Sequence, residues 1–237
     1  MGKSPNTIQT KLSAISFIHR IQDISEPVSS NLVHQTMIAI RKGNICTDVR
    51  LPITITLLDR LCRSLQETCL SHYHRIMYNS MFLLAFFALL RVGEFTISQA
   101  GVLNNLQLSQ IHYHCEDNSL GITFTHFKHS NGRVHTIRID SLIDNCPVKA
   151  MLSYLNIRGL SPGPLFIDSI GSPISRHVFN QQLNRCLNFL SLSPSVYKTH
   201  SFRIGAATYA ASLGWSDAKI RHMGRWNSNA FHKYIRL

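Results

Sequence analysis

The first part of the chain, about residues 6–45, carries apolar residues at the spacing of amphipathic helices. The recurring positions are Ile8, Leu12, Ile15, Phe17, Ile18 and Ile21. Glu26-Pro27 interrupts the pattern, Ser29 or Ser30 can cap a second helix, and Gly43 can end it. Two helices bury little surface on their own. We therefore expect residues 1–45 to be the C-terminal remnant of a larger helical domain.

The stretch from Cys46 to Pro52 is short, polar and charged, and we interpret residues 46–52 as a linker. After it, Thr54 or Thr56 can cap a helix with an apolar leucine face. This face consists of Leu57, Leu58, Leu61 and Leu65. A second, very apolar helix is predicted over about residues 72–90. A membrane span needs roughly twenty apolar residues, so this shorter run indicates a buried core helix.

The period of the apolar pattern changes to two between Leu106 and Ile139, as in β-strands. The alternating positions are Leu106 and Leu108, then Ile122 and Phe124, then Val134, Ile137 and Ile139. Breaks fall at Glu116-Asp117-Asn118 and at Ser130-Asn131-Gly132, and Asn-Gly between alternating runs is a strong hairpin signal. Helical patterns resume at about 147–158, 174–190, 202–213, 216–223 and 227–235. The sequence predicts a mainly α fold with a small three-stranded antiparallel sheet.

The charge balance narrows the class of partner. Lys and Arg number 24 against 12 Asp and Glu, which gives a formal net charge of +12. An excess of this size indicates a polyanionic partner, because each neutralised phosphate releases counterions, although a basic protein without a nucleic-acid partner has the same balance. The six cysteines are scattered and no apolar leader is visible at the N-terminus. We therefore expect free thiols in a reducing compartment.

The residues with the most chemical content lie near the C-terminus. They are the segments Lys198-Thr199-His200-Ser201-Phe202-Arg203, Gly224-Arg225-Trp226 and Tyr234-Ile235-Arg236. His200 and Arg203 are three residues apart and share a helix face. Upstream, Arg91 and Glu94 stand at the end of the predicted apolar helix. Such groups suit phosphodiester chemistry, because arginine forks neutralise phosphate oxygens and a side-chain nucleophile keeps the bond energy in a covalent ester.

This order of residues resembles the tyrosine recombinase/integrase family, which includes the phage integrases, Cre and the Xer proteins. The matching positions are Arg91 for the first catalytic arginine, Glu94 for the acid that follows it, Lys128 for the hairpin lysine, His200 and Arg203 for the H-x-x-R box, Trp226 for the His or Trp position, and Tyr234 for the nucleophile. The resemblance covers the chain from about Asn6 onward. The Gly-Arg-Trp and Tyr-Ile-Arg phrases resemble the eukaryotic DIRS/Crypton-type transposon branch.

The resemblance implies a site-specific recombinase that cuts and rejoins double-stranded DNA through a 3′-phosphotyrosine intermediate, for integration or excision of a mobile element. It implies no metal or other cofactor, a homotetramer on DNA, no membrane, and a nuclear location for a eukaryotic member or the cytoplasm or nucleoid otherwise. Residues 1–45 would then be the remnant of a helical core-binding (SAM-like) DNA-binding domain. Residues 53–237 would be the catalytic DNA breaking-rejoining domain.

The resemblance also implies roles for the matching residues. Arg91 and Arg203 would clamp the scissile phosphate, and Lys128 would protonate the leaving 5′ oxygen. His200 would assist as acid or base. Trp226 would donate through its indole N–H, and Glu94 would hold neighbouring groups in place. Tyr234 would be the nucleophile.

Two features depart from the family pattern. The spacing from Trp226 to Tyr234 is one residue shorter than in the phage and bacterial members, which we attribute to a shorter turn at Asn227-Ser228-Asn229. Only three residues follow Tyr234, whereas family members often carry a further C-terminal segment.

Other interpretations remain open at this point. The chain could be a truncated, non-catalytic DNA-binding relic of a mobile element, or a type IB topoisomerase. Taken singly, Arg91 could be a helix-end cation and Trp226 and Tyr234 ordinary core residues. The histidine-rich segments His72-Tyr73-His74 and His112-Tyr113-His114-Cys115 could supply metal ligands, but no second cluster stands at zinc-finger spacing.

Overall fold

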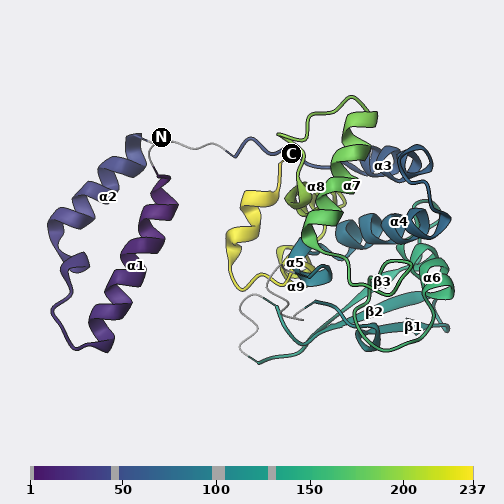
Figure 1. Ribbon diagram of the computed structural model, residues 1–237, viewed down its shortest axis with the longest axis horizontal. Helices are drawn as coiled ribbons and strands as arrows, with labels where there is room; N and C mark the ends of the chain where they lie inside the picture. Colours follow the sequence, from purple (N-terminus) through teal and green to yellow (C-terminus); the bar gives the residue numbers. More distant parts are fainter. Residues whose placement is uncertain (1–2, 44–47, 98–104, 128–131, 237) are drawn as a thin grey trace. The chain divides into compact units, whose positions relative to one another are not determined.

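The computed structural model describes residues 3–43, 48–97, 105–127 and 132–236. The chain divides into a smaller unit, Met1–Val49, and a larger unit, Arg50–Leu237 (Figure 1). None of the helices within the described ranges has the length and apolar character needed to cross a membrane.

The smaller unit consists of α1 (Pro5–Ile21), the 3-10 turn η1 (Pro27–Ser29) and α2 (Asn31–Gly43). The Ser4 side chain caps α1 by accepting a hydrogen bond from the Thr7 amide at 3.2 Å. Among the described residues of this unit, only Ser16 and Met37 are buried. The predicted apolar face of α1 is largely exposed, with Phe17 at 63%. The single neighbouring helix of this unit, α2, covers only a small part of this apolar face.

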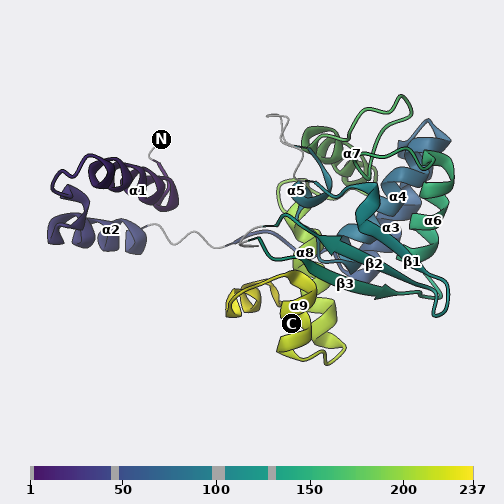
Figure 2. The same ribbon diagram turned by 90° about the horizontal axis from the view of Figure 1, so that it is seen from below.

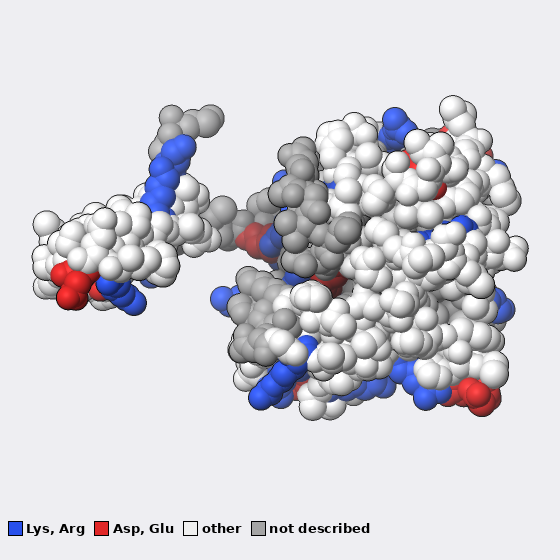
Figure 3. Space-filling model, turned by 60° about the horizontal axis from the view of Figure 1, so that its bottom comes forward, with Lys and Arg blue, Asp and Glu red and all other residues white. Residues whose placement is uncertain are grey.

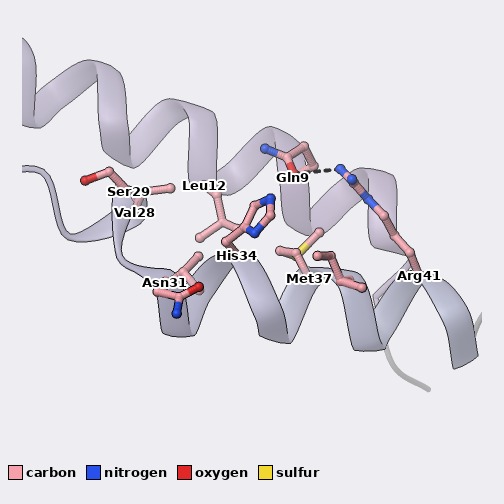
Figure 4. A pocket seen from close by; sticks show the side chains of 10 residues that line it. Gln9, Leu12, Val28, Ser29, Asn31, His34, Met37 and Arg41 are labelled. Carbon is pink, nitrogen blue, oxygen red and sulfur yellow. Dashed lines mark hydrogen bonds between the residues drawn. The ribbon is translucent and has the colours of Figure 1, made fainter.

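A groove of about 410 Å³ separates α1 from α2 (Figure 4). Leu12, His34 and Met37 line it. Arg41 on α2 donates a hydrogen bond of 3.0 Å to the side-chain oxygen of Gln9 on α1. The two helices are thus held together by few interactions of their own.

The larger unit is a set of helices beside one antiparallel sheet (Figures 1 and 2). Its helices are α3 (Ile55–Thr68), α4 (His72–Phe87), α5 (Val92–Phe95), α6 (Pro147–Arg158), α7 (Arg176–Phe189), α8 (Thr199–Ser212) and α9 (Asp217–Gly224), with 3-10 helices η2 (Leu108–Gln110) and η3 (Asn229–Tyr234). The strands are β1 (Ile111–His114), β2 (Ser119–Phe124) and β3 (His135–Asp140), in the order β1-β2-β3. The mainly α fold with a three-stranded antiparallel sheet is therefore confirmed.

The core is centred on α4, which packs against α3, α6 and α8. Residues 77–86 are buried with the exception of Asn79, as expected for a core helix. Phe82 on α4 contacts both Phe179 on α7 and Phe202 on α8, with ring centroids 5.7 and 5.4 Å apart. These contacts fix α8 against the core, and α8 carries part of the predicted site.

The start of α3 lies against the middle of α8. Thr54 caps α3 by accepting from the Leu57 amide at 3.2 Å, one of the two caps predicted. The preceding residue, Ile53, donates its amide to the carbonyl of Ser201 at 3.0 Å. A Cβ on Gly205 would overlap the Ile53 backbone, so a side chain at position 205 would push the two elements apart.

Several boundaries differ from the sequence-based expectation. Leu106 and Leu108 do not form the first strand; Leu108 lies in η2, and β1 begins at Ile111. β2 and β3 pair as predicted, but β2 ends at Phe124 and β3 begins only at His135. The predicted turn at Ser130-Asn131-Gly132 lies largely outside the described residues. The predicted last helix, 227–235, is the shorter 3-10 helix η3.

Candidate functional site

The predicted site residues come from four separate segments of the larger unit. Arg91 and Glu94 belong to the start of α5, and His200 and Arg203 to the first turns of α8. Trp226 follows α9, and Tyr234 is the last residue of η3. Lys128, the predicted general acid, lies outside the described residues. The other six are brought together through the contacts below.

Arg91 does not end the apolar helix, as the sequence suggested. The helix α4 ends at Phe87, and Arg91 is the N-cap residue of α5. The Glu94 carboxylate accepts one hydrogen bond from the Arg91 amide at 2.8 Å and another from its guanidinium at 2.9 Å. The boundary shifts because Leu89 adopts a positive φ of 48°, which turns the chain between the two helices.

α8 begins at Thr199, three residues before the predicted start, so His200 and Arg203 both lie on it. The Ser201 hydroxyl helps to start the helix by accepting from the Lys198 amide at 3.1 Å. Arg203 is fully buried, with no exposed surface. Its guanidinium donates to the backbone carbonyls of Leu89 and Gly224. Arg203 therefore ties α8 to the ends of both α4 and α9.

Arg225 is a buried site residue that the sequence analysis did not select. Its side chain has no exposed surface and donates to Glu94 at 2.8 Å. It also donates to the carbonyls of Leu89 at 3.0 Å and Met223 at 2.8 Å. The only sequence signal was its place between Gly224 and Trp226, because hydropathy does not reveal that an arginine is buried.

The Gly-Arg-Trp segment folds back on itself after α9. Arg225 has φ 54° and ψ 47°, the left-handed conformation common at helix C-termini. A Cβ on Gly224 would overlap the Trp226 ring, so the glycine is what lets that ring lie against the chain. The turn therefore sends Arg225 toward Glu94 and Trp226 toward Arg203.

Two aromatic rings lie near Arg203, and a third lies beside one of them. Its guanidinium carbon lies 3.8 Å from the Trp226 ring centroid and 5.8 Å from that of Tyr234. The Tyr234 ring is 5.3 Å from Trp226 and 5.0 Å from His200, measured between centroids. The 3-10 helix η3 thus brings Tyr234 beside the other site residues despite the short spacing from Trp226.

The buried cluster carries more positive than negative charge. Arg91, Arg203 and Arg225 share one carboxylate, that of Glu94. Burial alone would raise the pKa of this carboxyl, but Arg225, Arg203 and Arg91 hold it below its ordinary value. Burial, and then repulsion by Arg91 and Arg225, lowers the pKa of Arg203 well below the usual arginine value. A second anion beside Arg203 would offset the repulsion from Arg91 and Arg225 and stabilise the charged form of Arg203.

Three buried donors of the cluster also lack an acceptor. The Nε atoms of Arg203 and Arg225 and the indole Nε1 of Trp226 make no hydrogen bond within the described part of the chain. Buried donors are rarely left unpaired. Together with the excess positive charge, they favour an oxyanion as the missing partner, with the Tyr234 ring close by. The ranges that the structure covers contain no group of three or more His, Cys, Asp or Glu residues arranged to hold a metal ion.

The comparisons with known proteins agree with this fold. No protein-family model and no curated protein matches the sequence. Among solved structures, the chain is similar to the Tn1549 transposon integrase in complex with transposon right end DNA, with a TM-score of 0.67 and 14% identity over 100% of this chain and 76% of that chain. It is also similar to a lambda integrase dimer bound to a COC′ core site, with a TM-score of 0.64 and 17% identity over 98% and 59%.

A third similar structure is the XerH site-specific recombinase bound to palindromic difH substrate. Its TM-score is 0.60 and its identity 15%, over 80% of this chain and 49% of that chain. The chain thus spans about half the length of XerH. At these identities the likeness establishes the fold, which is that of tyrosine recombinase catalytic domains.

Proposed function

We propose that this chain is a site-specific DNA recombinase or integrase that cuts and rejoins strands through a covalent bond to Tyr234. The observation that carries the proposal is the convergence of Tyr234, His200, Trp226 and Arg203 in a cluster where the buried Arg203 Nε and Trp226 Nε1 are unpaired. The structural neighbours support it further, because they are recombinases and integrases bound to DNA.

The chemistry follows from the cluster. A scissile phosphate beside Arg203 and Arg91 has its non-bridging oxygens neutralised, and the Trp226 N–H donates to one of them. The Tyr234 oxygen attacks phosphorus and loses its proton. The bond from phosphorus to the 5′ oxygen breaks, and that oxygen takes up a proton. In the reverse direction a 5′-hydroxyl attacks the phosphotyrosine and restores the strand. The resemblance assigns the proton on the 5′ oxygen to Lys128.

The charge of the surface supports binding to DNA. The net charge is +12, and basic side chains lie along the lower edge of the larger unit in Figure 3. Arg133, Arg138 and Lys233 of this unit are exposed. Phosphate contacts of this kind give affinity that falls steeply with salt.

The finer assignment is also a proposal. The Gly224-Arg225-Trp226 and Tyr234-Ile235-Arg236 phrases support the DIRS/Crypton-type transposon branch, with a role in integration or excision of a mobile element in the nucleus. Assembly as a homotetramer on DNA is proposed from the same resemblance.

The proposal is tested with a random pool of nicked suicide duplexes, in which the cut strand end diffuses away and religation stops. The wild-type chain is expected to give protein–DNA adducts that survive denaturation, and sequencing of the bound DNA reveals the target. Tyr234→Phe is expected to bind the same DNA without forming an adduct. Specific binding by the wild type with no adduct would support the non-catalytic alternative. Relaxation of a supercoiled plasmid that lacks the target would support the topoisomerase alternative.

A further inference from the structure

The buried contacts of Arg225 suggest a role beyond stability. Its guanidinium lies between the Glu94 carboxylate, at 2.8 Å, and the carbonyls of Ala88, Leu89 and Met223. It also lies over the Phe124 ring of β2, 4.1 Å from the centroid. Arg225 thus contacts the ends of α4 and α9, the acid of α5 and the sheet. Its Nη atoms are taken up by these protein contacts, whereas its buried Nε makes no hydrogen bond within the described part of the chain.

The position is unusual for an arginine. The left-handed conformation at φ 54° and ψ 47° is one that residues other than glycine, asparagine and aspartate rarely adopt. The side-chain bonds of Arg225 therefore hold the turn. A glycine at position 225 would accept the same backbone conformation without these bonds.

Glu94 has three candidate partners but only two oxygens. Its Oε1 binds Arg91 at 2.9 Å, and its Oε2 binds Arg225 at 2.8 Å and the Arg91 amide at 2.8 Å. Arg203 is close enough for its charge to lower the pKa of Glu94, yet the carboxylate makes no hydrogen bond to it among the described contacts. The Nε atoms of Arg203 and Arg225 both remain unpaired among the described residues.

From this arrangement we infer that Arg225 is a positioning residue that occupies Glu94 and so keeps Arg203 and the Trp226 N–H available for the phosphate. Three guanidinium groups and one carboxylate leave two positive charges in excess. Without Arg225, one excess charge remains, and Glu94 gains a free lone pair next to Arg203. The inference rests on the proposed function, because it assigns the phosphate to this cluster.

The test uses the two tryptophans of the chain, Trp215 and Trp226. Trp215 lies beside Lys219, outside the cluster, so the Trp215→Phe background leaves Trp226 as a fluorescent reporter. Inorganic phosphate is titrated against Trp226 emission at constant ionic strength, and circular dichroism checks that each variant is folded. This measurement needs neither the target DNA nor strand cleavage.

Arg225→Gly is expected to weaken phosphate binding at least tenfold. Arg225→Gly combined with Glu94→Gln removes the released carboxylate and restores two excess charges, so affinity should return to within about threefold of the parent. A residue that served only to stabilise the fold would give no rescue, because the double variant loses even more buried bonds. Equal affinity of Arg225→Gly and parent, or failure of rescue, overturns the inference.

Glu94→Gln alone keeps the inference falsifiable if Arg225→Gly does not fold. With Arg225 in place and the carboxylate removed, phosphate should bind at least threefold more tightly than in the parent; unchanged or weaker binding overturns the inference. A parent protein whose Trp226 emission never responds to phosphate would instead contradict the anion site of the proposed function. The two failures are therefore distinguishable.

Discussion

The guanidinium of Arg203 lies over the indole ring of Trp226, 3.8 Å from its centroid. The two residues come from the second half of the larger unit, one on α8 and one after α9. The stacking of a cation on an aromatic face is favourable, and it leaves a donor of each residue, Arg203 Nε and Trp226 Nε1, without an acceptor in the described structure. This pair, with Tyr234 beside it, is the centre of the proposed phosphate site.

Trp226→Phe removes the indole N–H and keeps an aromatic ring at this position. The smaller ring still covers Arg203, so we expect a loss of stability of about 1–2 kcal/mol from lost packing. The rate of strand cleavage should fall about 100-fold, because a donor to the transition-state phosphate is removed. Denaturant unfolding and single-turnover cleavage measure the two effects. Trp215→Phe removes a comparable ring from the pair with Lys219 and should leave cleavage unchanged; similar cleavage by both variants would contradict the role of the N–H.

Glu94→Ala should be strongly destabilising. The change leaves the buried guanidinium of Arg225 without its carboxylate, and breaking a buried pair in this way costs about 3–5 kcal/mol. The free energy of unfolding in urea measures the loss. Arg63→Ala is the matched control, because Arg63 pairs with Asp59 at the surface, where its side chain is 78% exposed, and such pairs contribute less than about 1 kcal/mol. Equal losses in the two variants would show that the Glu94 pair is not buried as described.

The sequence predicted the fold class and most helices because the apolar periodicity reports which faces are buried. It also selected His200, Arg203, Trp226 and Tyr234, which the structure brings together; their catalytic roles stay predictions. It missed Arg225, because burial of a charged residue depends on partners such as Glu94 and Leu89 that lie far away in the chain. It also extended α4 to residue 90, because the left-handed turn at Leu89 carries no glycine or proline signal.

Gly205→Ala tests the contact between α8 and the start of α3. The added methyl group would overlap the backbone of Ile53, and overpacking of this kind costs about 1–3 kcal/mol. Thermal or urea unfolding gives the change in stability. At Gly93 a Cβ meets no atom of the described structure within 4 Å, so Gly93→Ala should be neutral or slightly stabilising. If Gly205→Ala leaves the free energy of unfolding unchanged, α3 and α8 lie further apart than the structure places them.

His135 should make the stability of the larger unit depend on pH. Burial, and then the neighbouring His222, lowers the pKa of His135 below its ordinary value of about 6.5. In the window between the lowered and the ordinary pKa, the unfolded chain binds more protons than the folded one, so stability is present above this window and is lost as pH falls through it. Unfolding curves between pH 5 and 8 on a wild-type and a His135→Gln protein check this.

Glutamine can still donate to the His222 carbonyl, which His135 Nε2 contacts at 2.9 Å. The difference between the stability curves of the wild-type and His135→Gln proteins should therefore report the titration of His135 alone. We expect His135→Gln to have the shallower fall at acid pH. Parallel curves would show that His135 titrates alike in the folded and unfolded chains.

Tyr234 is expected to form the covalent bond to DNA. After trapping on a nicked suicide duplex that carries the selected target, the adduct is treated with nuclease and cleaved before Asp217, which releases residues 217–237. Tyr234 is the only tyrosine in this segment. Mass spectrometry should find the residual nucleotide on this segment at Tyr234, and Tyr234→Phe should give none. A nucleotide on any other residue, or an adduct that persists in Tyr234→Phe, would contradict the account.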